Sequence, residues 1–200
     1  MIGGAGYMRI IQGTAVGLVM FAAVAALAEH EATEAGAQAA VAGGGTAVDS
    51  EGRLHVPDDY RRTYQLLGSW AIAADDGRGS KEIHVVYASP GTIDAFQKDQ
   101  RFPDGAVLVK EVFKTATGEL TTGTVSHADA LKGWFVMVKD ATNRYPGNAL
   151  WGDGWGWSWL NAADPSKTTT INYKAECRTC HVPARASDWV YLDGYPSLKR

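Results

Sequence analysis

Two cysteines three residues apart, with a histidine directly after the second, form the sequence CRTCH at positions 177–181. On a helix, residues three and four positions apart share a face, so Cys177, Cys180 and His181 are expected to point the same way. Pro183 disfavours helical geometry in the residue before it, so this helix should end after the histidine. C-x-x-C-H is the attachment signature of c-type haem. The sequence therefore predicts one haem c per chain, attached covalently through Cys177 and Cys180, with His181 as the proximal iron ligand.

A redox pair, a zinc site and coincidence are weaker interpretations of the two cysteines. A thioredoxin-type redox pair usually lies near the first strand of a βαβ unit, and no such unit precedes this motif. A zinc site would need further ligands; His84 and His127 are available, but a single C-x-x-C is weak support for zinc. The chance that this composition places two cysteines three positions apart with a histidine directly after them is on the order of 10⁻⁴, so coincidence is a weak explanation for so specific a motif.

The N-terminal sequence has the pattern of a secretory signal peptide. Arg9 precedes an apolar run over residues 10–27, which ends in Ala26-Leu27-Ala28 before Glu29. A basic start, an apolar middle and an A-x-A end predict cleavage after Ala28 and export to the periplasm, outside the bacterial cytoplasm, where haem is attached covalently. The alternative is an uncleaved anchor helix of about 18 residues, marginal against the ~20 that a bilayer needs. Cleavage would leave Met137 as the only methionine.

Composition narrows the remaining possibilities. The chain is 46% hydrophobic and 20% charged, which is typical of a soluble globular protein. Its net charge of −3 argues against a strongly cationic nucleic-acid binder, so no nucleic-acid partner is expected. Residues 29–50 are half Ala or Gly and contain no aromatic side chain, which predicts a flexible leader. The folded domain is therefore expected over residues 51–200.

Strand patterns outnumber helix patterns in this domain. Helices are expected from Pro57 to Leu67 and from about Ser89 to Asp99, each with a proline in its first turn. Strands are expected at 82–88, 106–113, 120–127, 134–140 and within 150–160. These elements predict an α+β fold, with a mainly antiparallel β-sheet, a few short helices and the haem-binding helix near the C-terminus.

Two strands carry side chains of special interest. Alternation places Lys110 on the same strand face as Leu108 and Val112, where a free ammonium is costly. A lysine buried in this way loses its charge more readily and gains nucleophilic character, unless it extends to the edge of the sheet. Further along, Trp155, Trp157 and Trp159 recur at period two, as expected either for core packing or for the wall of a large flat ligand.

The sixth iron position distinguishes an electron carrier from a ligand-binding haem. Carriers usually bind iron through His and Met, but no methionine follows this motif and the only candidate is Met137, upstream of it. The sequence thus favours a five-coordinate iron that can bind a small molecule, with a Met137-ligated carrier as the alternative. A four-helix cytochrome c′ does not fit the number of strand patterns.

From Pro57 to Arg200 the sequence resembles the cytochrome P-460 family and its relatives, the cytochromes c′-β. The resemblance rests on six blocks: EIHVVY at 82–87, FPDGAVLVKEV at 102–112, WFVMVKD at 134–140, the tryptophan-rich 146–160, AECRTCH at 175–181 and DWVYLDGYPSL at 188–198. It implies a periplasmic c-type haem protein, a homodimer, with a mainly antiparallel β fold.

The resemblance also implies roles for single residues. In the hydroxylamine-oxidising members a strand lysine is bonded to the porphyrin edge, and the matching position is Lys110. A pocket arginine of those members is replaced by His84 and a pocket glutamate by Phe135. The implied activity is hydroxylamine oxidation, with His84 accepting a proton and electrons passing to another cytochrome. The alternative is a non-catalytic binder of NO and CO, with Phe135 as an apolar cap on the pocket.

Overall fold

The structure is a computed structural model that describes residues 1, 3 and 46–199. The expected signal peptide and most of the expected leader lie outside the described residues. The chain divides into Met1–Ala39 and Ala40–Arg200, and the second unit contains the elements that follow. Ordered structure in this unit begins before residue 51, because Ala47 is buried and Val48 forms a β-bridge with Leu54. Among the described residues, none of the helices has the length and apolar character needed to cross a bilayer.

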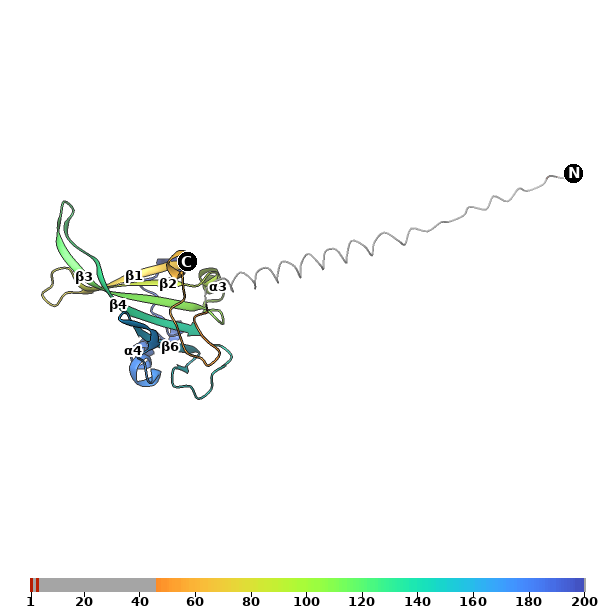
Figure 1. Ribbon diagram of the computed structural model, residues 1–200. Helices are drawn as coiled ribbons and strands as arrows, with labels where there is room; N and C mark the ends of the chain where they lie inside the picture. Colours follow the sequence, from red (N-terminus) through yellow and green to blue (C-terminus); the bar gives the residue numbers. More distant parts are fainter. Residues whose placement is uncertain (2, 4–45, 200) are drawn as a thin grey trace. The chain divides into compact units, whose positions relative to one another are not determined.

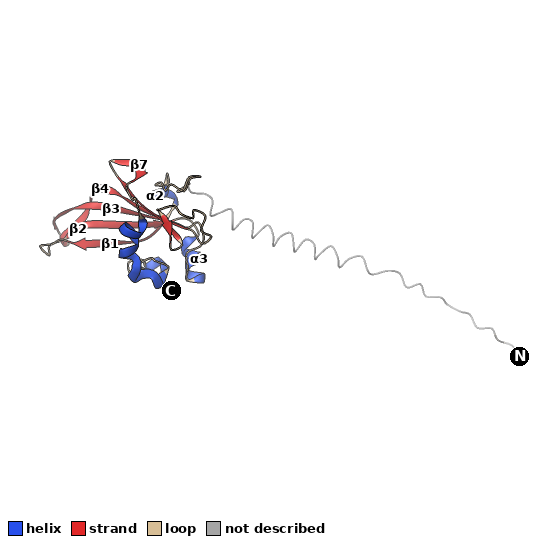
Figure 2. Cartoon of the chain, turned by 90° about the horizontal axis from the view of Figure 1, so that it is seen from below, coloured by secondary structure: helices blue, strands red, loops and turns tan. Residues whose placement is uncertain are grey.

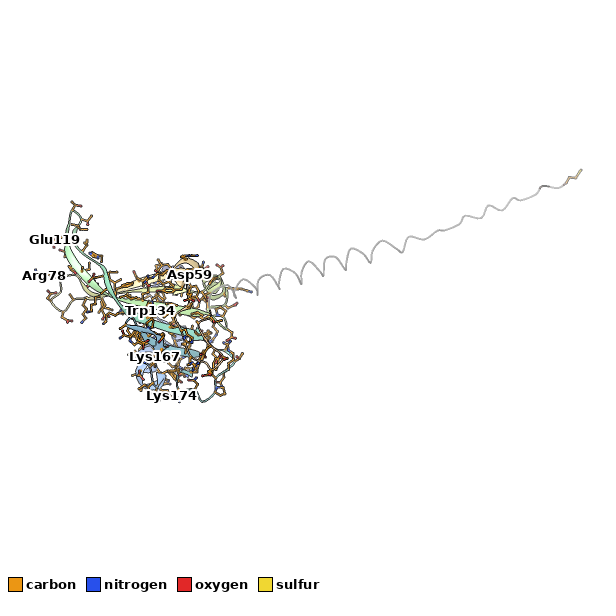
Figure 3. The ribbon with its side chains drawn as sticks, in the orientation of Figure 1. Asp59, Arg78, Glu119, Trp134, Lys167 and Lys174 are labelled. Carbon is orange, nitrogen blue, oxygen red and sulfur yellow. The ribbon has the colours of Figure 1, made fainter. Side chains whose placement is uncertain are left out.

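One antiparallel sheet of seven strands organises this unit, with the order β1-β2-β3-β4-β6-β5 and β7 paired to β6 (Figure 1). The strands are β1 (Gln65–Ala73), β2 (Ser80–Ala88), β3 (Val107–Leu120), β4 (Gly123–Lys139), β5 (Trp151–Gly152), β6 (Trp155–Asn161) and β7 (Asp164–Thr168). The two longest, β3 and β4, form a hairpin whose tip projects beyond the other strands, as the label on Glu119 shows in Figure 3. The predicted α+β class is confirmed.

Three expected elements are wrong in extent. The helix predicted from Pro57 to Leu67 is reduced to α2 (Tyr60–Thr63), and Gln65 already belongs to β1. Pairing of β1 with β2 from Gln65 to Ala73 overrides the local helix signals, because nearly every residue of this strand gains a cross-strand partner there. The strands predicted at 120–127 and 134–140 lie largely within the single strand β4, since β3 continues to Leu120 and pairs with β4 on both sides of an irregular stretch before Gly133.

The helix expected near 89–99 and the helix expected at the C-x-x-C-H motif lie near their predicted positions. Helix α3 (Thr92–Asp99) follows β2 and packs Phe96 into the core. After β7 come a π-helical turn η2 (Lys174–Arg178), α4 (Thr179–His181) and the 3-10 helices η3 (Val182–Ser187) and η4 (Pro196–Leu198). The α-helix ends at His181 as predicted, but the chain continues as η3, where Pro183 is tolerated in the first turn.

The sheet separates two cores. On β3, Val107, Val109 and Glu111 face the N-terminal segment that carries Leu54 and Tyr60. Between them, Leu108, Lys110 and Val112 face the helical segments that follow β7. Figure 2 shows helical segments near the C-terminus lying against the strands. The period of two along β3 thus assigns each side chain to one core or the other.

Candidate haem site

A cavity of about 650 Å³ lies between the sheet and the C-terminal helical segments. Its volume falls within the roughly 300–1,000 Å³ of small-molecule and cofactor sites. Strands β1 to β4 and β6 form one wall, and η2 and α4 contribute the other. The cavity brings together every site residue predicted from the sequence, together with the methionine considered as an alternative ligand: His84, Lys110, Phe135, Cys177, Cys180, His181 and Met137.

A row of three directly paired residues crosses the wall formed by the sheet. Lys110 on β3 pairs with Phe135 on β4, and Phe135 pairs with Trp159 on β6. The Lys110 Nζ atom lies 4.3 Å from the centroid of the Phe135 ring, and the Phe135 and Trp159 ring centroids are 4.5 Å apart. An ammonium over an aromatic face is an attractive contact. The strand register therefore holds Lys110 in the cavity wall, against aromatic surface.

Burial changes the protonation of Lys110. Desolvation lowers the pKa of its ammonium below the usual 10.5, and the negative charges of Glu82 and of the two cysteines as thiolates oppose this shift. A lower pKa makes the neutral amine, which is the nucleophilic form, more accessible at neutral pH. Lys110 thus presents a partly desolvated amine in the wall of the cavity.

The two thiols come from consecutive turns of the helical segment that begins at Lys174 (labelled in Figure 3). Cys177 is buried and Cys180 is exposed, and neither forms a disulfide. Burial raises the pKa of the Cys177 thiol to about 11. The Tyr191 hydroxyl donates a hydrogen bond to the Cys180 carbonyl at 2.6 Å and ties the helical turn to the segment that follows it.

One hydrogen bond of His181 determines which ring nitrogen is free. Its Nδ1 atom lies 2.6 Å from the Trp189 carbonyl oxygen, which can only accept, so Nδ1 carries the proton and Nε2 keeps its lone pair. Desolvation lowers the pKa of this imidazole below 6.5, which favours the neutral form that a metal ligand must have. The Trp157 ring meets it edge to face at 4.9 Å between centroids. Two free thiols, one oriented neutral imidazole and aromatic walls are a donor set that fits a haem.

His84, Glu82 and Lys132 form a polar corner of the cavity, and no sequence pattern had indicated the last two residues. His84 Nε2 lies 3.0 Å from Glu82 Oε2, and the second oxygen of Glu82 binds the Lys132 ammonium. Hydrogen bonds from Lys132 and His84 lower the pKa of the Glu82 carboxyl, so it is ionised and accepts a proton-bearing Nε2. The neutral imidazole then has Nδ1 as its acceptor.

The position of His84 also changes its own protonation. Its side chain is only 15% exposed, and desolvation lowers its pKa below 6.5, partly opposed by the hydrogen bond to Glu82. The period of two could have found Glu82, since it lies on the same strand face as His84. Lys132 could not be found in this way, because irregular pairing beside Gly133 brings it to the cavity.

The three tryptophans divide between the two roles that the sequence left open, core packing and the wall of a ligand site. Trp157 and Trp159 line the cavity, whereas Trp155 is fully buried in the core and donates its Nε1 hydrogen to the Asp188 carbonyl at 3.0 Å. His127, a zinc candidate in the sequence, is exposed and lies outside the cavity lining. Within residues 46–199, no cluster of three or more His, Cys, Asp or Glu side chains is arranged to hold a bare metal ion.

Comparison with known families agrees with this site. A search among curated proteins found no match. The family model for cytochrome P460 matches residues 57–192, which include all seven strands and the whole C-x-x-C-H motif. Because this match covers more than half of the 200 residues, and because the donor set fits a haem, the chain belongs to the cytochrome P460 family of haem proteins.

Proposed function

We propose that this protein is an exported monohaem c-type cytochrome that oxidises hydroxylamine and passes the electrons to another redox protein, such as a second cytochrome. The observation that carries the proposal is the polar corner of the cavity, where His84 is hydrogen-bonded to an ionised Glu82. A site that only holds a neutral gas has no need of a proton acceptor, whereas oxidation of hydroxylamine releases protons together with electrons.

The motif residues would hold the haem. Cys177 and Cys180 would form the two thioethers, and His181 would bind the iron through Nε2, the nitrogen left free by the Nδ1 hydrogen bond to Trp189. When bound, the haem supplies an iron that binds the substrate nitrogen and accepts its electrons. The aromatic wall of Phe135 and Trp159 would keep water from the reacting nitrogen.

The polar corner would receive the protons. His84 is neutral above a pKa that burial holds below 6.5, so its Nδ1 accepts a proton at neutral pH. Glu82 orients the ring through Nε2 and stabilises the imidazolium that forms, in the manner of a carboxylate behind a catalytic histidine. Lys132 keeps Glu82 ionised. His84 and Glu82, both on β2, would thus supply the proton acceptor that Phe135 cannot provide.

Lys110 would be bonded through Nζ to a carbon of the porphyrin edge and would tune the macrocycle. The new N–C bond would replace one N–H and one C–H bond, and an oxidant such as a peroxide would take up the two electrons during maturation. The support for this bond is the lowered pKa of Lys110 and its place in the cavity wall against Phe135. Distortion of the macrocycle is one of the means by which a protein changes the properties of a haem.

One experiment tests attachment and cross-link together. The full chain is expressed with a cytochrome c maturation apparatus, and the purified protein is digested and analysed by mass spectrometry. We expect haem on the peptide that contains Cys177 and Cys180, with the Lys110 peptide attached to the same haem. A colourless protein would overturn the whole proposal. Turnover of hydroxylamine with an artificial electron acceptor then tests the activity.

The alternative, a non-catalytic binder of NO and CO, is favoured by one observation: the packed pair of Phe135 and Trp159 gives the cavity an apolar surface. An unmodified Lys110 with tight NO binding and no turnover would support it. The proposed periplasmic location and the homodimer are checked by N-terminal sequencing of the mature protein, expected to begin at Glu29, and by native mass spectrometry.

A further inference from the structure

A buried ion pair between Lys139 and Asp188 lies outside the lining of the cavity. Asp188 directly precedes Trp189, whose carbonyl binds the proposed iron ligand His181. Lys139 Nζ, at the end of β4, is 2.6 Å from Asp188 Oδ1, and the two side chains are only 11% and 7% exposed. Neither residue lines the cavity, and neither has a part in the proposed chemistry of the haem site. A buried pair of this kind costs desolvation energy and is therefore weak evidence for stability alone. Its place in the structure suggests another role.

Two further contacts hold Asp188, and a third holds its partner Lys139. Its second carboxylate oxygen accepts the Phe102 backbone N–H at 3.2 Å. Its carbonyl accepts the Trp155 indole N–H at 3.0 Å. The Lys139 ammonium in turn lies 5.0 Å from the centroid of the Trp155 ring. Charge, side chain and backbone of Asp188 are thus all fixed by residues of β4, β6 and the turn before β3.

The backbone at Asp188 and Trp189 has an uncommon conformation. Their φ angles are 57° and 67°, so two successive residues with side chains are left-handed. This region is unfavourable for any residue with a Cβ atom, and a bulky aromatic residue rarely adopts it. Such a conformation persists only where surrounding contacts impose it. Here it turns the Trp189 carbonyl toward His181, 2.6 Å from Nδ1.

We propose that the Lys139–Asp188 ion pair is a positioning device for His181. It holds the left-handed pair of residues in place, and this keeps the Trp189 carbonyl on the Nδ1–H group. A carbonyl acceptor at this position raises the basicity of the second ring nitrogen and fixes the plane of the ring. The ion pair therefore strengthens the bond from His181 to iron and lowers the reduction potential, although it touches neither ligand nor haem. The inference rests on the proposed function only in that His181 binds the iron.

The test uses variants of the haem-loaded protein. Lys139→Met removes the cation at similar length, and Asp188→Asn removes the anion with a residue that still tolerates a positive φ. Lys139→Arg retains the pair. Tyr60→Phe, in the core on the opposite face of the sheet, is the control for a general loss of stability. The two measurements are the iron–histidine stretching band in the resonance Raman spectrum of the ferrous protein and the reduction potential.

We expect Lys139→Met and Asp188→Asn to shift the iron–histidine band to lower frequency and to raise the potential. Lys139→Arg and Tyr60→Phe should leave both unchanged. A folded Asp188→Asn protein with the band and potential of the parent would show that the pair is merely structural and would overturn the inference, even if Lys139→Met does not fold. An absent iron–histidine band in the unaltered protein would instead contradict the ligand assignment in the proposed function.

Discussion

Glu82 and His84 lie two residues apart on β2, and a hydrogen bond of 3.0 Å joins Oε2 of the carboxylate to Nε2 of the ring. Alternate residues of a strand share a face, so both side chains line the same cavity. The pair resembles a general base with its orienting carboxylate. It therefore has a measurable part in the proposed reaction.

Replacement of His84 separates catalysis from binding. Because general base catalysis typically contributes 10²–10⁴-fold, His84→Ala should slow hydroxylamine oxidation by about 10²-fold or more. The affinity for NO should change little, since NO binds without proton transfer. Stopped-flow turnover and NO titration measure the two quantities. Glu82→Gln, which keeps the shape of the partner but not its charge, should give a smaller loss. Equal rates for His84→Ala and the parent protein would remove His84 from the mechanism.

The pH dependence of the rate follows from the lowered pKa of His84. Desolvation keeps this pKa below 6.5, so more than half of the base is unprotonated at pH 6.5 and the rate should fall in more acid solution. The hydrogen bond to Glu82 raises the pKa, so Glu82→Gln should move the acid limb to still lower pH. Rates are compared with those of His84→Gln at each pH, because protonation of the substrate affects both proteins equally. If the acid limb of the pH–rate profile lies at the same pH in Glu82→Gln as in the parent protein, the proposed coupling between Glu82 and His84 is wrong.

Lys110 should determine the optical spectrum. In the proposed protein the ferrous haem has a strongly red-shifted Soret band because Lys110 is bonded to the porphyrin. Lys110→Met should abolish this shift while haem remains attached through the two cysteines. Lys114→Met is the matched control, since Lys114 lies on the same strand but outside the lining of the haem cavity. A red-shifted band that survives in Lys110→Met would exclude the cross-link.

Met137 lines the cavity, so its role as a sixth ligand can be tested directly. Leu has similar volume and packs in the same space, so Met137→Leu should cost less than about 1.5 kcal/mol of stability. We expect no change in the ferric spectrum, because the proposed iron is five-coordinate. Loss of a methionine-to-iron band from a low-spin spectrum would support the simple electron carrier instead.

The core on the opposite face of the sheet should affect stability without affecting the haem. The Tyr60 hydroxyl donates to the buried Glu111 carboxylate and accepts from the Trp134 indole at 2.8 Å, while Arg61 Nε also donates to Glu111 at 2.5 Å. Tyr60→Phe leaves the Trp134 indole N–H without its acceptor and removes one of the two donors to Glu111, so it should cost about 1–3 kcal/mol in urea unfolding. The visible spectrum should stay that of the parent protein.

Local rules predicted much of the site. The alternation of β3 placed Lys110 beside Leu108 and Val112, and the structure puts all three in the cavity wall. The helical spacing of the motif brought Cys177, Cys180 and His181 to the same cavity. In each case the relevant neighbours are within four residues, where periodicity alone fixes the direction of a side chain.

Long-range pairing determined what the sequence could not predict. The residues after Thr63 have a proline-initiated helix pattern, but they form β1 because an edge of β2 is available for pairing. Lys132 reaches Glu82 across a register shift in the β3–β4 pair, and no local pattern marks a register shift. The acceptor for His181, the Trp189 carbonyl, is a backbone group, which every residue possesses and no composition distinguishes.

Within residues 46–199 the cysteines follow all seven strands, and the segment that carries Trp189 and Tyr191 comes after them. The acceptor for His181 and the donor to the Cys180 carbonyl therefore both lie C-terminal to the C-x-x-C-H motif. A chain that stopped at His181 would keep both thiols and every strand of the cavity wall, but it would lose the two contacts that secure the motif.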